Sequence, residues 1–384
     1  MLAASLAGCV TPPSPSRGPA PAPPESAAAV LRAASFAAIP GWRDDDPAAA
    51  WPGFVAGCTA LLAQLSGASI WRDSCDAAAA VDSHSGAAVR AFFESHFTPY
   101  QLTAADGRDS GVVTGYYEPL LQGSRTRSER YRFPLYAVPD DLLTVDLAEL
   151  YPELKDKRVR GRLDGRRVVP YWPRADIDAG RAPLAGKELV WVDDPVEAFF
   201  LQIQGSGRVQ LAEGGVLRIG YADQNGHPFH SIGRLLVERG ELPLARASMQ
   251  GIKAWGREHP DRLPALLDEN PSYVFFRAVP PYPAATIDGP IGTLGVPLLA
   301  GRTIAVDPAI VPLGAPVFLA TTYPLSDRPL LRLVLAQDTG GAIKGALRAD
   351  YFWGFGDEAG REAGRMKQQG RMWLLWPKDA ALPY

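Results

Sequence analysis

Residues 331–354 read LRLVLAQDTGGAIKGALRADYFWG, and two apolar runs in this stretch each carry one aspartate. The first run, Leu331–Gln337, has the length and composition of a strand and leads directly to Asp338. Gly340 and Gly341 come next, and glycine permits sharp turns and the close approach of a ligand to the backbone. Because successive side chains of a strand alternate between its faces, we expect Asp338 on the face opposite the leucines of the run.

The second aspartate, Asp350, stands directly before the three aromatic residues Tyr351–Trp353. Apolar surroundings raise the pKa of a carboxyl group because they disfavour its charged form, and a general acid that works near neutral pH needs such a pKa. A third aspartate, Asp307, follows the strand-like Thr303–Val306 and precedes a proline, which is also typical of a simple turn. The three positions predict a carboxylate site on strands, with Asp350 as the main candidate for the acid.

The remaining sequence alternates between helical and β-rich regions. Residues 28–98 are expected to be helical, because their apolar residues recur every three or four positions. Short β-rich runs bounded by glycine and proline dominate residues 111–225 and 273–376, with helices expected at 231–238, 247–258 and 261–267. One more helix is expected from Asp357, whose carboxylate can cap free amides, to Gly370. The pattern predicts an α+β protein that is mainly β.

Composition excludes several classes of function. The 384 residues carry a net charge of −3, which leaves no basic excess for nucleic acid. No run of about 18 apolar residues is available to span a membrane. No cysteine, histidine or carboxylate group has the spacing of metal ligands, so we expect neither a metal nor a cofactor.

The first residues suggest lipidation. Leu6-Ala7-Gly8-Cys9 is similar to a bacterial lipobox, in which small residues precede the cysteine that receives lipid, and a Pro/Ala-rich stretch follows. We expect a lipid on Cys9 and an extended tether within residues 1–27. A chance run of small residues is the alternative, because no charged segment precedes it and the apolar run is short for a signal peptide; we infer an initiator further upstream.

Two further cysteines lie in the helical region. Cys58 and Cys75 are seventeen residues apart in an expected helical hairpin. In an oxidising compartment they would pair, closing a loop worth about 3 kcal/mol in the chain-entropy model. Two buried free thiols are the alternative.

Several motifs together resemble the membrane-bound lytic transglycosylase A family. The resemblance covers about residues 111–377 in the expected order, and it is carried by Thr114–Pro119, Phe200–Gly207, Asn225–His227, Ser231–Gly233, Ser248–Gln250, Val306–Pro308, Val311–Gly314, Ala336–Gly345, Asp350 and Trp353–Gly356. It implies a double-psi β-barrel with N-terminal helices, formed by residues 28–115 and 245–378. A second β-barrel over residues 116–244 would be inserted in it, with a glycan groove between the two.

The resemblance also implies roles for single residues. The same barrel in expansins and one family of endoglucanases carries its acid in a His-Phe-Asp motif, whereas Arg348 and Ala349 precede Asp350 here. Because this local sequence differs, both Asp350 and Asp338 are candidates for the catalytic residue; Asp350 is favoured and Asp338 is the alternative. The candidates for substrate binding are Asp307, Tyr117, Gln204, Ser206, Gly341 and Lys344. Gln202 and Gln204 are expected on one face of a strand, and core packing is the alternative for Tyr117.

The implied activity is non-hydrolytic cleavage of peptidoglycan glycan strands. One acid protonates the glycosidic oxygen and then accepts a proton from the muramoyl C6 hydroxyl, which closes a 1,6-anhydro ring; most hydrolases need two carboxylates instead. The implied place is the periplasmic face of the outer membrane of a Gram-negative bacterium, held by lipid, with other cell-wall enzymes as candidate partners. An expansin-like protein that binds glycan without cutting it, and a hydrolase on the same barrel, remain alternatives.

Overall fold

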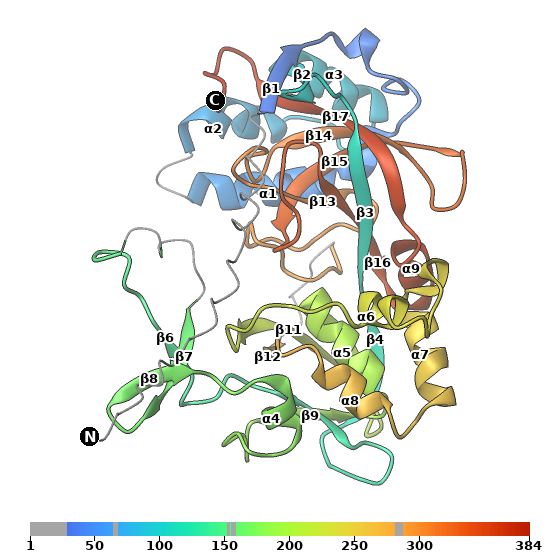
Figure 1. Ribbon diagram of the computed structural model, residues 1–384. Helices are drawn as coiled ribbons and strands as arrows, with labels where there is room; N and C mark the ends of the chain where they lie inside the picture. Colours follow the sequence, from blue (N-terminus) through green and yellow to red (C-terminus); the bar gives the residue numbers. More distant parts are fainter. Residues whose placement is uncertain (1–28, 64–67, 152–153, 155–158, 281–286) are drawn as a thin grey trace, which may run out of the picture.

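The computed structural model describes residues 29–63, 68–151, 154, 159–280 and 287–384 (Figure 1). Cys9 and the tether expected over residues 1–27 lie outside the described residues. None of the described helices is both long and apolar enough to cross a bilayer.

A closed six-stranded barrel forms the larger part of the molecule. Its strands follow one another around the barrel in the order β17, β14, β15, β13, β16 and β3, and pairing of β17 with β3 closes the ring. Their bounds are β3 Gly111–Glu118, β13 Thr303–Val306, β14 Pro316–Thr322, β15 Pro329–Thr339, β16 Ala349–Phe355 and β17 Lys367–Pro377. β3 therefore comes from a segment more than a hundred residues before the other five strands. The chain between β3 and β13 is an insertion in the barrel.

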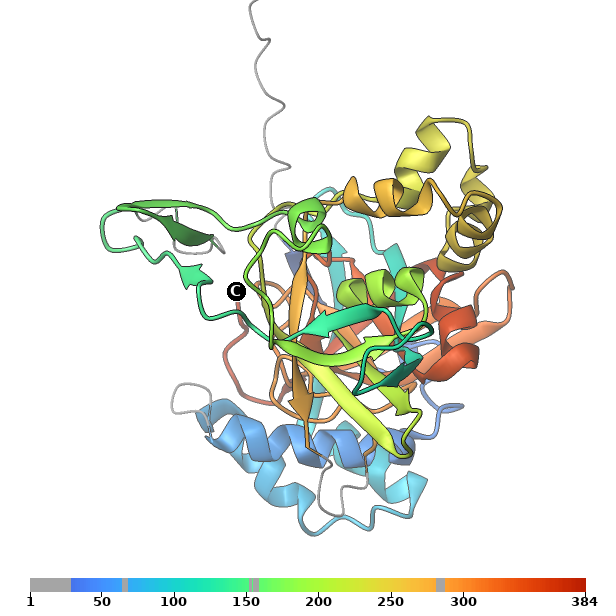
Figure 2. The same cartoon turned by 90° about the horizontal axis from the view of Figure 1, so that it is seen from below.

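The N-terminal region covers this barrel on one side. β2 (Phe97–Ala104) pairs with β17, and β1 (Ala29–Ala33) pairs with β2. The helices α1 (Trp51–Ala63), α2 (Ala68–Ala78) and α3 (Gly86–His96) pack on the same side (Figure 2). Short 3₁₀ turns at Phe36–Ala38 and Pro47–Ala50 lie between β1 and α1. The region is mostly helical, as expected. Residues 29–33 are the exception, because they form an edge strand that pairs with β2.

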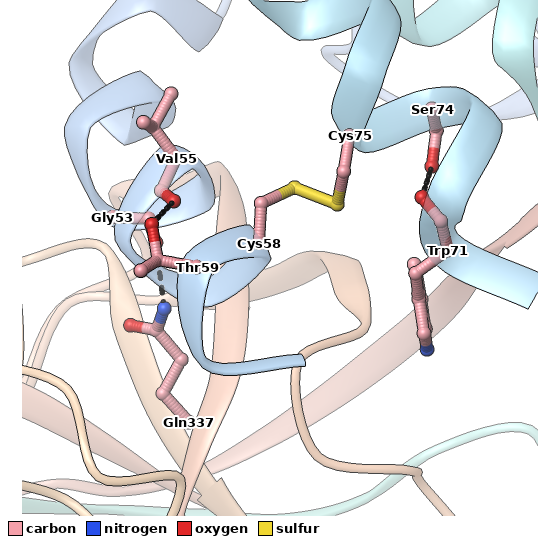
Figure 3. Close-up of a disulfide and its surroundings, with 8 residues drawn as sticks. All are labelled: Gly53, Val55, Cys58, Thr59, Trp71, Ser74, Cys75 and Gln337. Carbon is pink, nitrogen blue, oxygen red and sulfur yellow. Dashed lines mark hydrogen bonds between the residues drawn. A yellow bond between two sulfur atoms is a disulfide. The ribbon is translucent and has the colours of Figure 1, made fainter. Parts of the chain in front are cut away.

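A disulfide joins α1 to α2. The Sγ atoms of Cys58 and Cys75 are 2.06 Å apart, and both side chains belong to the main core (Figure 3). Beside it, the side-chain amide of Gln337 donates to the carbonyl of Gly53 at 2.7 Å. The helical hairpin is thus tied to β15, the strand that carries Asp338.

The inserted segment forms a second six-stranded sheet. Its order is β12, β11, β10, β4, β9 and β5, and a bridge from Ala137 to Phe276 links the two edges of the sheet into a barrel. The bounds are β4 Leu120–Ser124, β5 Phe133–Tyr136, β9 Glu188–Val192, β10 Ser206–Leu211, β11 Val216–Gln224 and β12 Val274–Val279. Because β12 pairs within this sheet, we propose that the inserted barrel runs to Val279 and not to residue 244.

Helices and a small sheet complete the insert. The helices are α4 Arg174–Asp178, α5 Pro195–Gln204, α6 Ile232–Glu238, α7 Met249–Glu258 and α8 Leu263–Asp268, with a 3₁₀ turn at Leu244–Arg246. β6 (Leu143–Thr144), β7 (Arg160–Asp164) and β8 (Arg167–Pro170) form a three-stranded sheet that projects from the body of the molecule (Figures 1 and 2). The fold class is mainly β with α, as predicted.

Two local predictions are wrong. The segment from Phe200 to Gln204, expected as a strand, ends helix α5, because the Asp194 carboxylate caps the free amides of Val196 and Glu197 and Gly205 ends the helix with a φ of 79°. The helix expected to reach Gly370 is α9 (Gly356–Ala363), and Asp357 lies in its first turn without being its cap.

Gly370 instead lies within β17. A Cβ atom at this position would come within 2.6 Å of Val113 on the neighbouring strand, so glycine is needed there for close packing of the barrel. Gly370, which the sequence predicts as the end of a helix, is therefore a glycine that allows close packing of strands.

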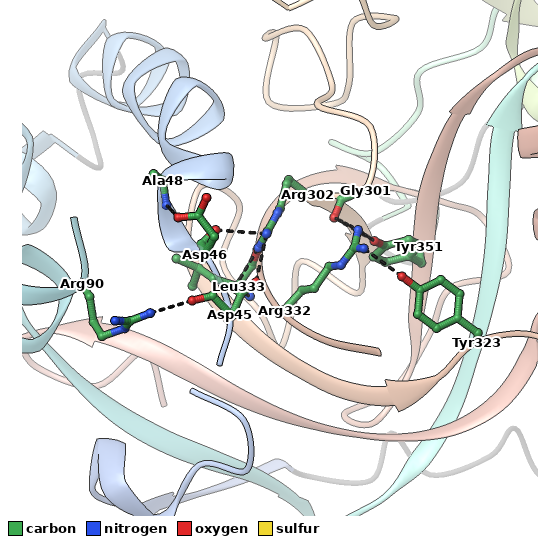
Figure 4. A network of polar contacts seen from close by, with 10 residues as sticks. All are labelled: Asp45, Asp46, Ala48, Arg90, Gly301, Arg302, Tyr323, Arg332, Leu333 and Tyr351. Carbon is green, nitrogen blue, oxygen red and sulfur yellow. Dashed lines mark hydrogen bonds and ion pairs between the residues drawn. The ribbon is translucent and has the colours of Figure 1, made fainter. Parts of the chain in front are cut away.

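A buried ion pair ties the N-terminal region to the barrel (Figure 4). The guanidinium of Arg302 donates to both carboxylate oxygens of Asp45, at 2.8 and 2.9 Å, and the two side chains are 9 % and 5 % exposed. The same carboxylate accepts the backbone N–H of Leu333 at 2.7 Å. Asp45 thus joins two neighbouring segments of the barrel.

Candidate active site

Two of the three aspartates lie in one row across the barrel. In the strand ladders, Asp338 on β15 stands opposite Ala305 on β13, and Ala305 stands opposite Asp350 on β16. Asp350 in turn stands opposite Thr114 on β3. Directly paired residues point to the same side of a sheet, so these side chains share one face. The neighbouring pair Ile304 and Tyr351 is fully buried in the core.

A β-bulge places Asp338 on this face. Ile304 pairs with Ala336 but the next residue, Ala305, pairs with Asp338, so β15 contains one extra residue at Gln337. The extra residue reverses the alternation, and Asp338 shares the face of Leu335. Our expectation that Asp338 lies opposite the leucines is therefore wrong, because alternation holds only for an unbroken ladder.

Asp338 is held by three hydrogen-bond donors. Its Oδ1 accepts from the backbone N–H and from the hydroxyl of Thr293, both at 3.0 Å, and its Oδ2 accepts from the hydroxyl of Tyr116 at 3.1 Å. Burial raises the pKa of Asp338 above its usual value, and the hydrogen bonds, above all those from Thr293, reduce this rise. Each of the three donors favours the ionised form of this aspartate.

Asp350 has a different environment. The hydroxyl of Thr114 donates to its Oδ1 at 2.5 Å, and this is the hydrogen bond that the described residues make to its carboxyl group. Burial raises the pKa of Asp350 most strongly, the Thr114 hydrogen bond and the Arg348 charge lower it, and the Asp338 charge raises it. A single donor and a neighbouring carboxylate favour the protonated form, which a general acid needs.

Tyr116 lies beside the row and supports Asp338. It lies two residues after Thr114 on the same face of β3, and its ring packs on Phe352 with centroids 5.1 Å apart. Burial raises the pKa of Tyr116 well above the usual value, so the hydroxyl stays a donor to Asp338. The sequence predicts the next residue, Tyr117, for substrate binding, whereas Tyr116 is the one of the two that donates to Asp338.

Two family models match the chain. One is described as the MltA specific insert domain and matches residues 112–277, and the other is described as the 3D domain and matches residues 302–376. The membrane-bound lytic murein transglycosylase A of Escherichia coli (strain K12) is 34% identical over 286 residues, which cover 72% of this chain and 68% of the relative. The chain belongs to the membrane-bound lytic murein transglycosylase A family.

Solved structures of the family agree with the fold. The crystal structure of MltA from Neisseria gonorrhoeae superposes with a TM-score of 0.80 at 42% identity and covers 92% of this chain and 94% of that chain. The structure of Escherichia coli MltA with bound chitohexaose superposes with a TM-score of 0.64 at 28% identity and covers 85% of this chain and 90% of that chain. The resemblance inferred from the sequence is therefore confirmed.

In this member of the family, Asp307 anchors the loop that follows Asp338. Its Oδ2 accepts the backbone N–H of Gly345 at 2.9 Å, and the ammonium of Lys344 lies 3.7 Å from its Oδ1. The carboxylate of Asp307 is buried, whereas Gly341 and Lys344 in the same loop are exposed. Asp307 thus positions the loop, and Gly341 and Lys344 are exposed on it, where a ligand can reach them.

The other expected substrate-binding residues lie where the chain passes between the two barrels. Tyr117 is buried against α9, and burial raises its pKa to about 12. Its backbone N–H donates to the side-chain oxygen of Gln204 at 3.3 Å. Ser206, two residues after Gln204, is the first residue of β10 and is half-buried. Gln202 is buried in the insert and accepts from Arg174 at 2.6 Å.

An ionic cluster fixes the passage between the barrels. The buried carboxylate of Glu118, at the end of β3, accepts from Arg208 of β10 at 2.8 Å. Arg208 also donates to Asp288 at 2.8 Å, on the segment that returns to the large barrel, and its guanidinium lies 4.0 Å from the ring of Phe355. Sequence reasoning missed this cluster, because Arg208 lies 90 residues from Glu118 and 80 residues from Asp288 in the chain.

The described residues contain no group of three or more histidine, cysteine, aspartate or glutamate side chains that is placed to hold a metal ion. Our expectation of no metal and no cofactor stays a prediction. The row and its neighbours offer two carboxyl groups, the hydroxyls of Thr114 and Tyr116, and the guanidinium of Arg348.

Proposed function

We propose that this chain is a lytic transglycosylase that cleaves the β-1,4 bond between N-acetylmuramic acid and N-acetylglucosamine in peptidoglycan. Membership in the lytic murein transglycosylase A family supports the reaction class and makes the protein a peptidoglycan-cleaving lyase. The finer statement, formation of 1,6-anhydromuramic acid by one aspartate, rests on the arrangement of Asp338 and Asp350.

The different hydrogen bonding of the two aspartates is the observation that carries the assignment. Asp338 accepts three hydrogen bonds and is best suited to remain ionised, whereas Asp350 accepts one and is best suited to hold a proton. We therefore assign Asp350 as the general acid. Asp338 is placed to stabilise the positive charge that develops at C1 in an oxocarbenium-like transition state.

The proposed reaction needs no water. Asp350 gives its proton to the glycosidic oxygen as the C1–O4 bond breaks. The resulting carboxylate takes the proton of the muramoyl C6 hydroxyl while O6 forms a new bond to C1. The acid is regenerated in its protonated form, and the nucleophile gains a high effective concentration because it belongs to the same sugar.

The substrate is proposed to lie across the outer face that carries the row, between the two barrels. A relative was crystallised with bound chitohexaose, which supports a glycan ligand for this chain. Gly341 and Lys344 on the exposed loop, and Gln204 and Ser206 beside the crossing, are proposed to contact it. Asp307 and Tyr117 are proposed to support these contacts indirectly, because both are buried.

The products test the mechanism. Digestion of purified peptidoglycan in H₂¹⁸O should yield fragments that end in 1,6-anhydromuramic acid, each lighter by one water than the hydrolytic product and free of ¹⁸O. Mass spectrometry of the muropeptides makes the measurement. Reducing ends that carry ¹⁸O would support a hydrolase, and glycan that is bound but uncut would support an expansin-like protein.

We also propose that a lipid on Cys9 holds the protein at the periplasmic face of the outer membrane, where other cell-wall enzymes are candidate partners. The lipobox-like Leu6–Cys9 and the relatives named as membrane-bound support a membrane-associated protein of the cell envelope. Stable anchoring generally takes two acyl chains, which a lipidated N-terminal cysteine supplies.

Cell fractionation tests the anchor. When the gene is expressed with a complete export signal, Cys9→Ala should move the protein from the membrane pellet to the soluble periplasmic fraction, because the acyl chains are lost. Cys58→Ala with Cys75→Ala is the control, since it removes thiols without removing the lipidation site. A Cys9→Ala variant that sediments with membranes as completely as the parent contradicts the lipoprotein proposal.

A further inference from the structure

Arg348 lies beside the proposed acid without pairing with it. It stands two residues before Asp350, directly before the first residue of β16. Its guanidinium donates to the carbonyl oxygens of Ala349 at 2.5 Å and Val112 at 3.3 Å, and to the hydroxyl oxygen of Thr114 at 2.8 Å. The ion pairs within 4.0 Å among the described residues do not join Arg348 to Asp350.

While Oδ1 of Asp350 carries no proton, the hydroxyl of Thr114 can serve both partners in only one way. A threonine hydroxyl has one hydrogen to donate and lone pairs that accept. Arg348 has only donors, so its N–H must point at a lone pair of the Thr114 oxygen. The single hydrogen of Thr114 is then directed to Oδ1 of Asp350.

We propose that Arg348 is a positioning residue for Asp350 and acts through the hydroxyl of Thr114. The proposal rests on the proposed function, since it assigns a support to the acid named there. Because Oδ1 of Asp350 always receives the Thr114 hydrogen, the proton used in the reaction is carried on Oδ2. Arg348 thereby determines which oxygen of the acid faces the glycosidic bond.

The interposed hydroxyl explains why an arginine is tolerated beside a general acid. A direct pair with arginine lowers a carboxyl pKa by about 1–3 units, which would leave the acid ionised at neutral pH. A hydroxyl between the two keeps the orientation and weakens the effect of the charge. The opposing influence of Asp338 and of burial keeps the pKa of Asp350 above its usual value.

The other charged and titratable groups around Asp350 are few. Asp338 on β15 and Tyr116 on β3 share its face, and Lys367 on β17 stands opposite Thr114 in the ladder. Arg348 is the cation whose charge acts on the pKa of Asp350, and Asp338 is the anion. A change in the pH profile after replacement of Arg348 therefore reports on this pair.

A double-mutant cycle tests whether Arg348 acts on Asp350 through Thr114. Arg348→Met and Thr114→Val should each reduce kcat roughly tenfold to a hundredfold, the range expected when a catalytic group is displaced without being removed. If Arg348 acts through Thr114, the double variant should be no slower than Thr114→Val alone. Thr114→Ser keeps the hydroxyl and should restore most of the activity, and Arg365→Met, at an exposed arginine after α9, should leave activity unchanged.

The pH profile separates positioning from a merely structural role. The alkaline limb of kcat/KM reports the loss of the proton from Asp350. Arg348→Met and Thr114→Val remove influences that lower this pKa, so both should move the limb to higher pH. Arg348→Lys keeps the charge but not the planar group, so its limb should stay close to that of the parent while kcat falls.

The outcomes distinguish the two proposals. If Asp350→Asn is inactive, two results would overturn the role of Arg348: losses of kcat that multiply in the double variant, or an alkaline limb that does not move in Arg348→Met. An active Asp350→Asn variant overturns the proposed acid itself. Thermal unfolding of every variant shows whether a loss of activity is a loss of fold, and the Thr114 variants test the relay even where Arg348→Met does not fold.

Discussion

Replacing Asp350 by asparagine is expected to abolish cleavage of peptidoglycan. The substitution keeps the size of the side chain and an oxygen that can accept the Thr114 hydrogen, but it removes the proton that titrates. Loss of a general acid typically costs about 10²–10⁴-fold in rate, and the loss should reach the upper end here because the same group later acts as the base. The release of soluble muropeptides measures the effect.

Asp338→Asn is the matched comparison for this variant. It removes a negative charge that raises the pKa of Asp350, so the pKa of Asp350 should fall and the alkaline limb of the pH profile should move to lower pH. Residual cleavage should remain, because the acid is still present. An inactive Asp338→Asn together with a nearly normal, folded Asp350→Asn would reverse the two roles.

Replacing Asp45 by alanine is expected to have the largest effect on stability. The substitution leaves the guanidinium of Arg302 buried without its counter-ion and the N–H of Leu333 without its acceptor. Breaking a buried ion pair by removing one partner typically lowers the free energy of unfolding by about 3–5 kcal/mol. Denaturant unfolding followed by tryptophan fluorescence makes the measurement.

An exposed ion pair gives the control. Arg234 and Glu238 form an i,i+4 pair on α6, with side chains 81% and 56% exposed. Arg234→Ala should lower the free energy of unfolding by less than about 0.5 kcal/mol, since such pairs are weak in water. A loss of this small size in Asp45→Ala would show that the network of Figure 4 contributes little to stability.

Local patterns located many elements. The strand-like run Thr303–Val306 has these bounds in the structure as β13. Helices α6 and α7 begin after the serines that cap them, Ser231 and Ser248, whose hydroxyls accept from backbone amides. These signals lie within a few residues of the element they define, so a single sequence contains them in full.

The helix α5 shows how a local signal is misread. The segment before Gly205 is apolar, and the Gly-Ser-Gly that follows looks like a hairpin turn. The competing signals, Asp194 with Pro195 at one end and Gly205 at the other, define a helix with both caps. Because of this error, Gln202 and Gln204 are predicted on one face of a strand, whereas both lie in helix α5.

By itself, the sequence determined the family, the mixed fold that is mainly β, and the candidate residues Asp338 and Asp350, because motifs and apolar periods are local and survive in one chain. Only the tertiary structure decided how those residues are arranged. The bulge at Gln337 exists because β15 pairs with β13, and Asp350 meets Thr114 because β16 pairs with β3, 236 residues apart in sequence. Such pairings depend on which strands become neighbours when the barrel closes, and no pattern within one strand specifies its neighbour.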